Sequence, residues 1–276
     1  MISLPPLSYH RPRTVEEAVS ILERYRGEAR VLAGGTDLLV DLRARARTPS
    51  HLVDIKDIPE LKRIVHLDNA VEVGSAVTLA EILKDEGMKS YQPLYKAVGM
   101  IADRIIRFRA TLAGNVCNAS PAADSAPALL VMGAEIKVVG PRGKRTIPIS
   151  EFFKGVKKTA LEPSELVESI RVPRTPDEAR SGFVKFGRSS EDLAIVNAAA
   201  MLVGNKLWVS YGSVAPTPMM IQVEAENYEE AVLRVLKEAP KVVKPISDVR
   251  ASAGYRLHLV KVATAKLLKE VYGEET

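Results

Sequence analysis

The sequence of 276 residues contains a single cysteine and only four histidines, which are His10, His51, His66 and His258. One thiol, Cys117, excludes an intramolecular disulfide, and it excludes an iron–sulfur cluster held by this chain alone because such clusters need several thiolates. The histidines are scattered, with no metal-ligand spacing around any of them. We therefore expect no metal site, and the cysteine content fits a reducing, cytoplasmic setting.

Long apolar runs are also missing. No stretch approaches the ~18 consecutive apolar residues of a membrane-spanning helix, and the first 17 residues contain prolines but no apolar segment of signal-peptide length. Hydrophobic residues make up 46% of the chain and charged residues 26%, a composition that excludes disorder of the chain as a whole. We expect a soluble protein without a membrane span.

Aromatic residues are few, at 5%, and 39 basic residues exceed 34 acidic ones only slightly, for a net charge of +5. This balance predicts solubility and indicates no nucleic-acid partner, since no aromatic cluster suited to base stacking accompanies it. The densest basic segment, residues 104–109, alternates arginines with apolar residues. That pattern is typical of a helix end with a solvated face, and a phosphate contact is the alternative.

The N-terminal region predicts a parallel βαβ unit. A capping box formed by Thr14 and Glu17 opens a helical pattern that ends near residue 27. Short apolar runs at residues 29–33 and 51–55 then flank a second helical pattern over residues 38–47. Because parallel strands need a crossover, the Gly34–Asp37 turn lies at the carboxyl end of a strand.

The glycine pair of this turn has a defined chemical use. Without side chains at Gly34 and Gly35, backbone can approach a diphosphate, and free N–H groups at a helix start attract anions. Thr36 adds a hydroxyl. The alternative is a tight strand-to-helix turn in which Asp37 serves only as the helix cap.

A second region begins near residue 58 and contains another capping box, formed by Thr78 and Glu81. The expected helices and strands of the rest of the chain are a strand at 70–76, helices at 94–106 and 125–132, strands at 135–139, 145–149, 166–172, 182–186, 194–202 and 207–211, and amphipathic helices at 228–238 and 255–272. The prolines at 173 and 176 make the best domain boundary.

Between two of these helices, residues 111–124 are rich in small and polar side chains and are expected to form a loop. Gly114, Asn115, Asn118, Ser120 and Asp124 offer polar groups with little steric bulk, as ligand-binding loops do. An ordinary surface loop with Asp124 as the cap of the next helix is the alternative.

The sequence supports no other phosphate-binding, dinucleotide-binding or catalytic motif. Residues 140–146 resemble a phosphate loop but lie between two strand patterns, so a hairpin turn is expected. The sequence has no G-x-G-x-x-G for a dinucleotide in a doubly wound sheet. It also lacks a nucleophile or acid–base motif, so we assign no catalytic residue.

Taken together, residues 33–39 (AGGTDLL) and 111–115 (TLAGN), with Ser120, Pro121 and Asp124, resemble the FAD-binding subunit of molybdenum hydroxylases. This family includes the medium chain of carbon monoxide dehydrogenase and the flavin domain of xanthine dehydrogenase. The resemblance continues through residues 152–159, 163–167, 190–194 and 211–218 and covers almost the whole chain.

The resemblance implies an α+β fold, with a vanillyl-alcohol-oxidase-like FAD-binding domain made of two α+β parts. A smaller C-terminal α/β domain with a three-stranded sheet follows. On this chain the FAD-binding domain is expected at residues 1–172, with parts at about 1–57 and 58–172, and the C-terminal domain at 177–276.

The resemblance also implies which residues contact the cofactor. The first pyrophosphate loop corresponds to Val31, Leu32, Ala33, Gly34, Gly35, Thr36, Asp37 and Leu38, and the second to Thr111, Ala113, Gly114 and Asn115, with Asn118 nearby. Asp124 corresponds to a cofactor-contacting aspartate, Ile101 and Val167 to apolar contacts near the rings, and Lys185 to a basic contact close to the flavin, with Leu193 as a weaker candidate.

Two departures from the family pattern stand out. Ala113 replaces a glycine, and its methyl group is tolerated only if the residue keeps a negative φ. The arginines of residues 104–109 replace a more polar pattern, and no cofactor role is assigned to them.

The implied function is electron transfer within a complex. A large subunit with a molybdenum cofactor would oxidise the substrate, a small subunit with [2Fe-2S] clusters would pass electrons onward, and FAD in this chain would deliver them to an external acceptor. A dimer of such heterotrimers is expected, and the apolar face of the last helix, with Leu257, Val260, Ala263 and Leu267, is a candidate contact. A self-sufficient flavin dehydrogenase and a non-enzymatic nucleotide-binding module are the alternatives.

Overall fold

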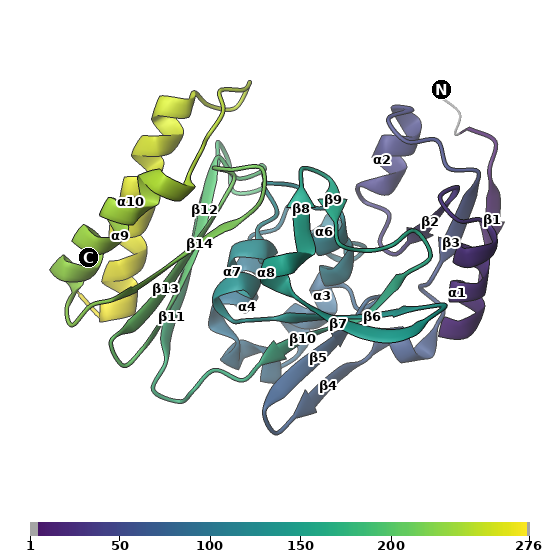
Figure 1. Cartoon of the computed structure of the whole chain (residues 1–276), viewed down its shortest axis with the longest axis horizontal. Coiled ribbons are helices and arrows are strands. Elements are labelled where there is room, and N and C mark those ends of the chain that lie inside the picture. Colours follow the sequence, from purple (N-terminus) through teal and green to yellow (C-terminus); the bar gives the residue numbers. More distant parts are fainter. Residues whose placement is uncertain (1–4, 275–276) are drawn as a thin grey trace.

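Three main β-sheets follow one another along the chain, with helices packed against and between them (Figure 1). The computed structural model describes residues 5–274, so the outermost positions of both expected domains, residues 1–4 and 275–276, lie outside the described residues. In Figure 1 the N-terminal sheet lies on the right, a five-stranded sheet in the middle and the C-terminal sheet on the left. Mixed helix and sheet confirm the expected α+β class.

The N-terminal sheet is parallel, with strand order β1-β3-β2. Its elements are β1 (Ser8–His10), α1 (Val15–Arg24), β2 (Ala29–Leu32), α2 (Leu38–Arg43) and β3 (His51–Asp54). This arrangement confirms the βαβ unit. Helix α2 ends four residues earlier than expected because Arg45 adopts a left-handed φ of 52°, which stops the helix.

Only half of the first expected capping box forms. The Thr14 hydroxyl accepts a hydrogen bond from the Glu17 N–H at 3.1 Å, but the Glu17 carboxylate accepts from the Arg13 N–H at 2.7 Å and not from Thr14. The second box, at Thr78 and Glu81, forms in full. Both helices therefore begin where the sequence predicts.

The middle sheet is antiparallel, with order β4-β5-β10-β6-β7. The elements of this region are η1 (Pro59–Lys62), β4 (Ile64–Leu67), β5 (Ala70–Gly74), α3 (Leu79–Lys84), η2 (Gly87–Ser90), α4 (Gln92–Gly99), α5 (Arg104–Arg107), α6 (Leu112–Cys117), α7 (Ser125–Val131), β6 (Glu135–Gly140), β7 (Gly143–Pro148), α8 (Ile149–Phe152), β8 (Phe153–Gly155), β9 (Lys158–Thr159) and β10 (Leu166–Pro173). Strands β6 and β7 form the expected hairpin.

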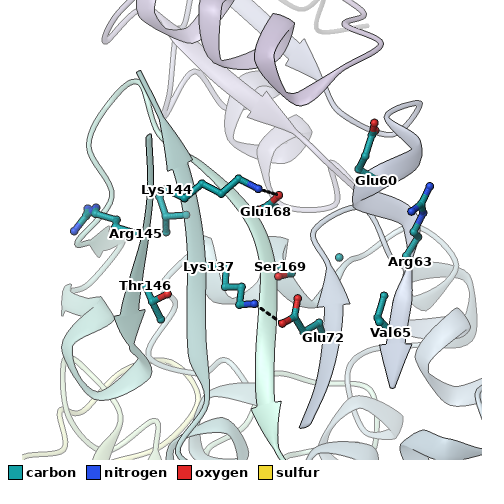
Figure 2. Close-up of a pocket in the computed structure, with 12 residues that line it drawn as sticks. Glu60, Arg63, Val65, Glu72, Lys137, Lys144, Arg145, Thr146, Glu168 and Ser169 are labelled. Atoms are coloured by element: carbon teal, nitrogen blue, oxygen red, sulfur yellow. Dashed lines mark hydrogen bonds and ion pairs between the residues drawn. The ribbon is translucent and has the colours of Figure 1, made fainter. Parts of the chain in front are cut away.

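The two faces of this sheet differ. Alternate residues such as Val73, Ile136 and Ile170 are buried in the main core against the helices. The opposite face forms an open groove of about 480 Å³ that contains two ion pairs (Figure 2). Lys137 pairs with Glu72, and Lys144 pairs with Glu168, with 2.7 Å between Lys144 Nζ and Glu168 Oε1. Because these charges are paired across strands, the groove is a solvated sheet face.

Two expectations for this region are wrong. The single helix expected at 94–106 is two helices, since Ala102 has φ 46° and the Asp103 carboxylate starts α5 by accepting from the Ile106 N–H at 2.7 Å. The loop expected at 111–124 contains α6, which the Thr111 hydroxyl caps by accepting from the Gly114 N–H at 3.0 Å.

The C-terminal sheet has four antiparallel strands, order β11-β12-β13-β14, where three were expected. Its elements are β11 (Arg180–Phe186), β12 (Val196–Val203), β13 (Lys206–Gly212), β14 (Met219–Glu224), α9 (Tyr228–Val242) and α10 (Ala253–Tyr272). The fourth strand, β14, lies at the edge and buries only Ile221.

Helices α9 and α10 cover one face of this sheet, and α4 and α7 pack against the other (Figure 1). Val260, Ala263 and Leu267 are buried in the resulting core. The stripe was a candidate partner contact only if the chain's own core did not use it; three of its four residues are used there, and only Leu257 is exposed.

Candidate functional site

A cleft of about 1,140 Å³ runs between the N-terminal sheet and the helical side of the middle region. The two loops that the sequence singled out both line it, although more than 70 residues separate them in the chain. Their meeting is a result of the tertiary fold. A cavity of this size lies at the upper end of the range for cofactor sites.

The first loop follows β2 and depends on both of its glycines. A Cβ added to Gly34 would lie 2.7 Å from the Arg109 carbonyl carbon and 2.8 Å from the Ala110 Cα, so backbone meets backbone there. Gly35 has φ 76°, a conformation that disfavours any side chain. Gly34 therefore lets the first loop pack directly against the segment that leads into the second.

The first loop also carries backbone donors without an acceptor among residues 5–274. None of the N–H groups of residues 34–37 donates a hydrogen bond to another described residue. Asp37 stands at the N-cap position of α2, but its carboxylate makes no capping bond. Gly34, Gly35 and Thr36 are half-buried and Asp37 is exposed, so these N–H groups are accessible from the cleft and are suited to an anionic ligand.

The second loop is held in place from two sides. Ser125, at the start of α7, donates to the Asn115 amide oxygen at 2.6 Å, and Lys157 donates to the Asn118 amide oxygen at 2.6 Å. Ala113 lies in the first turn of α6 with an ordinary negative φ. The Ala113 methyl group is thus accommodated without backbone strain, although this residue replaces a glycine of the family pattern.

Most of the expected site residues come together in the cleft. Those that line it are Val31, Ala33, Gly34, Gly35, Thr36, Asp37, Leu38, Ile101, Thr111, Ala113, Gly114, Asn115, Asn118 and Val167. Leu193, the weaker candidate, also lines it, with 60% of its surface exposed. Three expected residues do not line the cleft, namely Leu32, Asp124 and Lys185.

Leu32 packs into a small core with Leu42 and Leu52 beneath the first loop. Asp124 and Lys185 form a buried ion pair at 2.8 Å, in which each side chain is only 5% exposed. The expectation that Asp124 caps α7 is wrong, because its second oxygen accepts from the Asn197 amide at 2.7 Å and no capping bond forms.

This ion pair joins three parts of the fold. Lys185 on β11 also donates to the Met100 carbonyl oxygen at 2.7 Å, after the end of α4. Burial raises the pKa of Asp124 above its ordinary value, and the Lys185 ammonium and the Asn197 amide limit the rise. The pair thus fixes the C-terminal sheet against the wall of the cleft near Ile101.

The segment after α4 forms an apolar end of the cleft, lined by Ile101, Ala102 and Ile106. Arg107 holds its unusual turn by donating to the carbonyl oxygens of Ile101 at 2.8 Å and Ala102 at 2.6 Å. Among the basic residues of 104–109, Arg107 therefore has a structural role.

Sequence reasoning missed several residues that line the cleft. The β8–β9 hairpin contributes Lys154, Lys157 and Lys158, and the floor contributes Ser75 and Cys117. Burial raises the pKa of the Cys117 thiol to about 12, so the thiol stays neutral. Three lysines within five residues were a visible signal for the hairpin, whereas nothing in the local sequence points to Ser75.

Residues 5–274 contain no group of three or more His, Cys, Asp or Glu side chains placed to hold a metal ion. No helix within this described range is long and apolar enough to cross a membrane. The cleft presents glycine-lined backbone, unpaired N–H donors, lysines and an apolar end. These are groups that bind and orient a ligand.

Comparison with protein families agrees with this geometry. Residues 5–175 match the FAD binding domain in molybdopterin dehydrogenase, and residues 181–271 match the CO dehydrogenase flavoprotein C-terminal domain.

Individual proteins give the same result. The xanthine dehydrogenase FAD-binding subunit of Escherichia coli O157:H7 is 34% identical over 278 residues, which cover 95% of each chain. The carbon monoxide dehydrogenase medium chain of Afipia carboxidovorans is 31% identical over 266 residues, which cover 92% of each. A crystal structure of the Cu,Mo-CO dehydrogenase in its cyanide-inactivated form contains a chain with a TM-score of 0.93 and 28% identity, with 99% of this chain and 100% of that chain covered.

Proposed function

The chain belongs to the family of FAD-binding medium subunits of molybdenum hydroxylases, and from that premise we propose that it passes electrons from [2Fe-2S] clusters of a partner subunit to an external acceptor. It is an FAD-dependent oxidoreductase subunit. Bound FAD supplies the redox chemistry, because its ring system accepts and releases one or two electrons. The residues of the chain supply binding, orientation and electrostatics.

The observation that carries this proposal is the meeting of two loops over a set of unpaired donors. Gly34 allows the first loop to pack against Arg109 and Ala110, and the N–H groups of residues 34–37 have no acceptor among the described residues. Two glycine-containing loops side by side fit a diphosphate better than a single phosphate. The residues present therefore fit FAD.

We assign the first loop and residues 111–115 to the diphosphate, and Ile101 and Val167 to the ring system. Lys185 and Asp124 act from behind the wall of the cleft, where they hold the segment at Met100 in place. The proposed domains are residues 1–172, with parts at 1–57 and 58–172, and residues 177–276. The core of the C-terminal domain supports the boundary after residue 172, because all its buried members lie between Val184 and Val271. The other two cores cross the proposed boundaries, with Phe183 and Ala199 in the main core and Ala76 and Leu166 in the N-terminal one.

The substrate and its oxidation belong, in this proposal, to other chains. We infer a small subunit with [2Fe-2S] clusters and a large subunit with the molybdenum cofactor, assembled as a dimer of heterotrimers in the cytoplasm. The similarity to the medium chain of carbon monoxide dehydrogenase supports this division of labour. The chain itself needs no catalytic acid or base.

The isolated chain is expected to bind FAD without a covalent bond and to prefer it to FMN. The reason is that the two loops together provide donors for two phosphates, whereas FMN has one. Denaturation followed by chromatography of the released flavin checks this. Recovery of FMN, or of flavin still attached to peptide, would contradict the proposed function.

Gly34→Ala is expected to weaken FAD binding by about tenfold or more, which corresponds to about 1.4 kcal/mol. The added Cβ would collide with backbone atoms of Arg109 and Ala110, so the two loops must move apart. Titration of the FAD-free protein with FAD, followed by flavin fluorescence, measures the change. Gly35→Val is a poorer test, since its φ of 76° makes valine strain the folded state itself.

Gly254→Ala is the matched control, because a Cβ there meets no atom within 4 Å. It should leave FAD affinity unchanged. The circular dichroism melt of each FAD-free variant reports whether the fold is intact. Wild-type affinity in Gly34→Ala would show that the contact between the loops does not shape the cofactor site.

A further inference from the structure

Ser75 follows the last residue of β5 and lies in the floor of the cleft. Its backbone N–H donates to the Glu168 carbonyl oxygen at 3.1 Å, which places it beside Val167. Three residues further on, Thr78 forms a β-bridge with Thr111. Ser75 therefore lies on the strip of cleft floor that joins the apolar contact at Val167 to the second loop.

The side chain of Ser75 is buried and has no partner. The residue is 2% exposed, and its Oγ makes no hydrogen bond within the described part of the chain. Asn197 Oδ1 and Arg256 Nε are also buried and unpaired, but both side chains are bonded through their other atoms. Among these three residues, Ser75 alone has a side chain without a hydrogen bond.

An unpaired buried hydroxyl lowers the stability of the protein when the cleft is empty. Buried polar atoms in native structures are nearly always hydrogen-bonded, and each exception calls for an explanation. Alanine would fill the same space without the unpaired donor. The hydroxyl is thus explained if its partner is a molecule that enters the cleft.

We propose that Ser75 is a further cofactor-contacting residue, whose hydroxyl donates a hydrogen bond to an oxygen of bound FAD on the cleft floor between Val167 and Thr111. This inference rests on the proposed function, because it takes FAD as the occupant of the cleft. No hydrogen bond holds the hydroxyl in its present position. Rotation about the Cα–Cβ bond, which has three staggered positions, is enough to turn it toward a ligand.

The oxygen it reaches belongs either to the diphosphate or to the ribityl chain, since both offer acceptors along that strip. ADP carries the first, and riboflavin carries the second without any phosphate. Binding of these two fragments therefore distinguishes the two sources of the same chemistry.

Calorimetric titration of the full-length, FAD-free chain tests the inference. Ser75→Ala is expected to raise the Kd for FAD about threefold to tenfold, as the loss of one hydrogen bond does. Ser169→Ala is the matched control: Ser169 pairs with Gly74 in the neighbouring strand, is also buried, and lies in the groove on the other face of the sheet (Figure 2). It should leave the Kd unchanged.

A second measurement separates binding from folding. The FAD-free Ser75→Ala protein should melt no lower than the wild type, because the hydroxyl is unpaired until FAD binds. A weaker Kd for ADP places the contact at the diphosphate, and a weaker Kd for riboflavin places it at the ribityl side.

The inference is overturned if Ser75→Ala binds FAD as the wild type does, or if Ser169→Ala weakens binding equally. A lower melting temperature of the FAD-free Ser75→Ala protein, together with unchanged FAD affinity, would assign the hydroxyl to the fold instead. If the wild-type chain binds no FAD at all, the proposed function fails, and with it this inference.

Discussion

The purified, FAD-loaded chain is expected to show no turnover with aldehydes, purines or carbon monoxide. Residues 5–274 hold no metal-binding group, and the sequence contains one cysteine, too few for an iron–sulfur cluster. The proposed function gives the carboxylates and lysines that line the cleft no part in substrate oxidation. Chemically reduced protein should nevertheless be reoxidised by an artificial dye, because that step needs only the bound FAD.

Dye reduction in the presence of substrate measures this, first with the chain alone and then with its iron–sulfur and molybdenum partners. We expect a rate indistinguishable from background in the first case and steady turnover in the second. The Gly34→Ala chain combined with the same partners is the control for dependence on bound FAD. Steady turnover by the highly purified single chain would exclude the electron-transfer role and support a self-sufficient flavin dehydrogenase.

Lys185→Met is expected to lower the free energy of unfolding by about 3–5 kcal/mol, the usual effect of removing one partner of a buried ion pair. Asp124 would remain buried with the Asn197 amide as its remaining hydrogen-bond partner. The turn at Met100 would also lose a donor. Denaturant unfolding of the FAD-free protein, followed by circular dichroism, measures the loss.

The free energy of unfolding lost in Lys185→Met should increase with pH. Burial raises the pKa of Asp124, and removal of Lys185 raises it further. A group whose folded-state pKa is raised contributes stability below its unfolded pKa and loses that contribution as pH rises through the folded value. Lys185→Met should therefore be destabilised more at pH 8 than at pH 5.

Two variants complete this test. Lys144→Met makes the same change at an exposed ion pair, with Glu168 at 2.7 Å, and should cost less than about 1 kcal/mol. The double variant Asp124→Asn with Lys185→Met should recover most of the loss, because no buried charge remains. If Lys185→Met costs no more than Lys144→Met, the buried pair does not join the domains energetically.

The sequence predicted those elements whose signals are local. The cap at Thr14, the capping box at Thr78 and the apolar run of β10 each depend on residues close together in the chain, and all three elements appear where expected. The βαβ unit followed in the same way, since a strand, a helix and a strand in that order have one common arrangement.

Elements stabilised mainly by tertiary contacts were missed or misread. Strand β14 buries only Ile221 and exists through its pairing with β13, so its own pattern is weak. Helix α6 contains Gly114 and Asn115, which are poor helix formers, and it forms because Thr111 caps it and because it packs against α7. In both cases the deciding contacts lie outside the segment.

The same distinction applies to the site. The sequence by itself determined the two glycine loops, and its resemblance to the family identified residues of which most line the cleft. Only the tertiary structure decided that Gly34 packs against Arg109, that Asp124 pairs with Lys185 and not with its own helix, and that Ser75 lies buried at the cleft. These contacts join residues 61 or more positions apart in the first two cases, and their geometry depends on how the sheets pack, which no local pattern encodes.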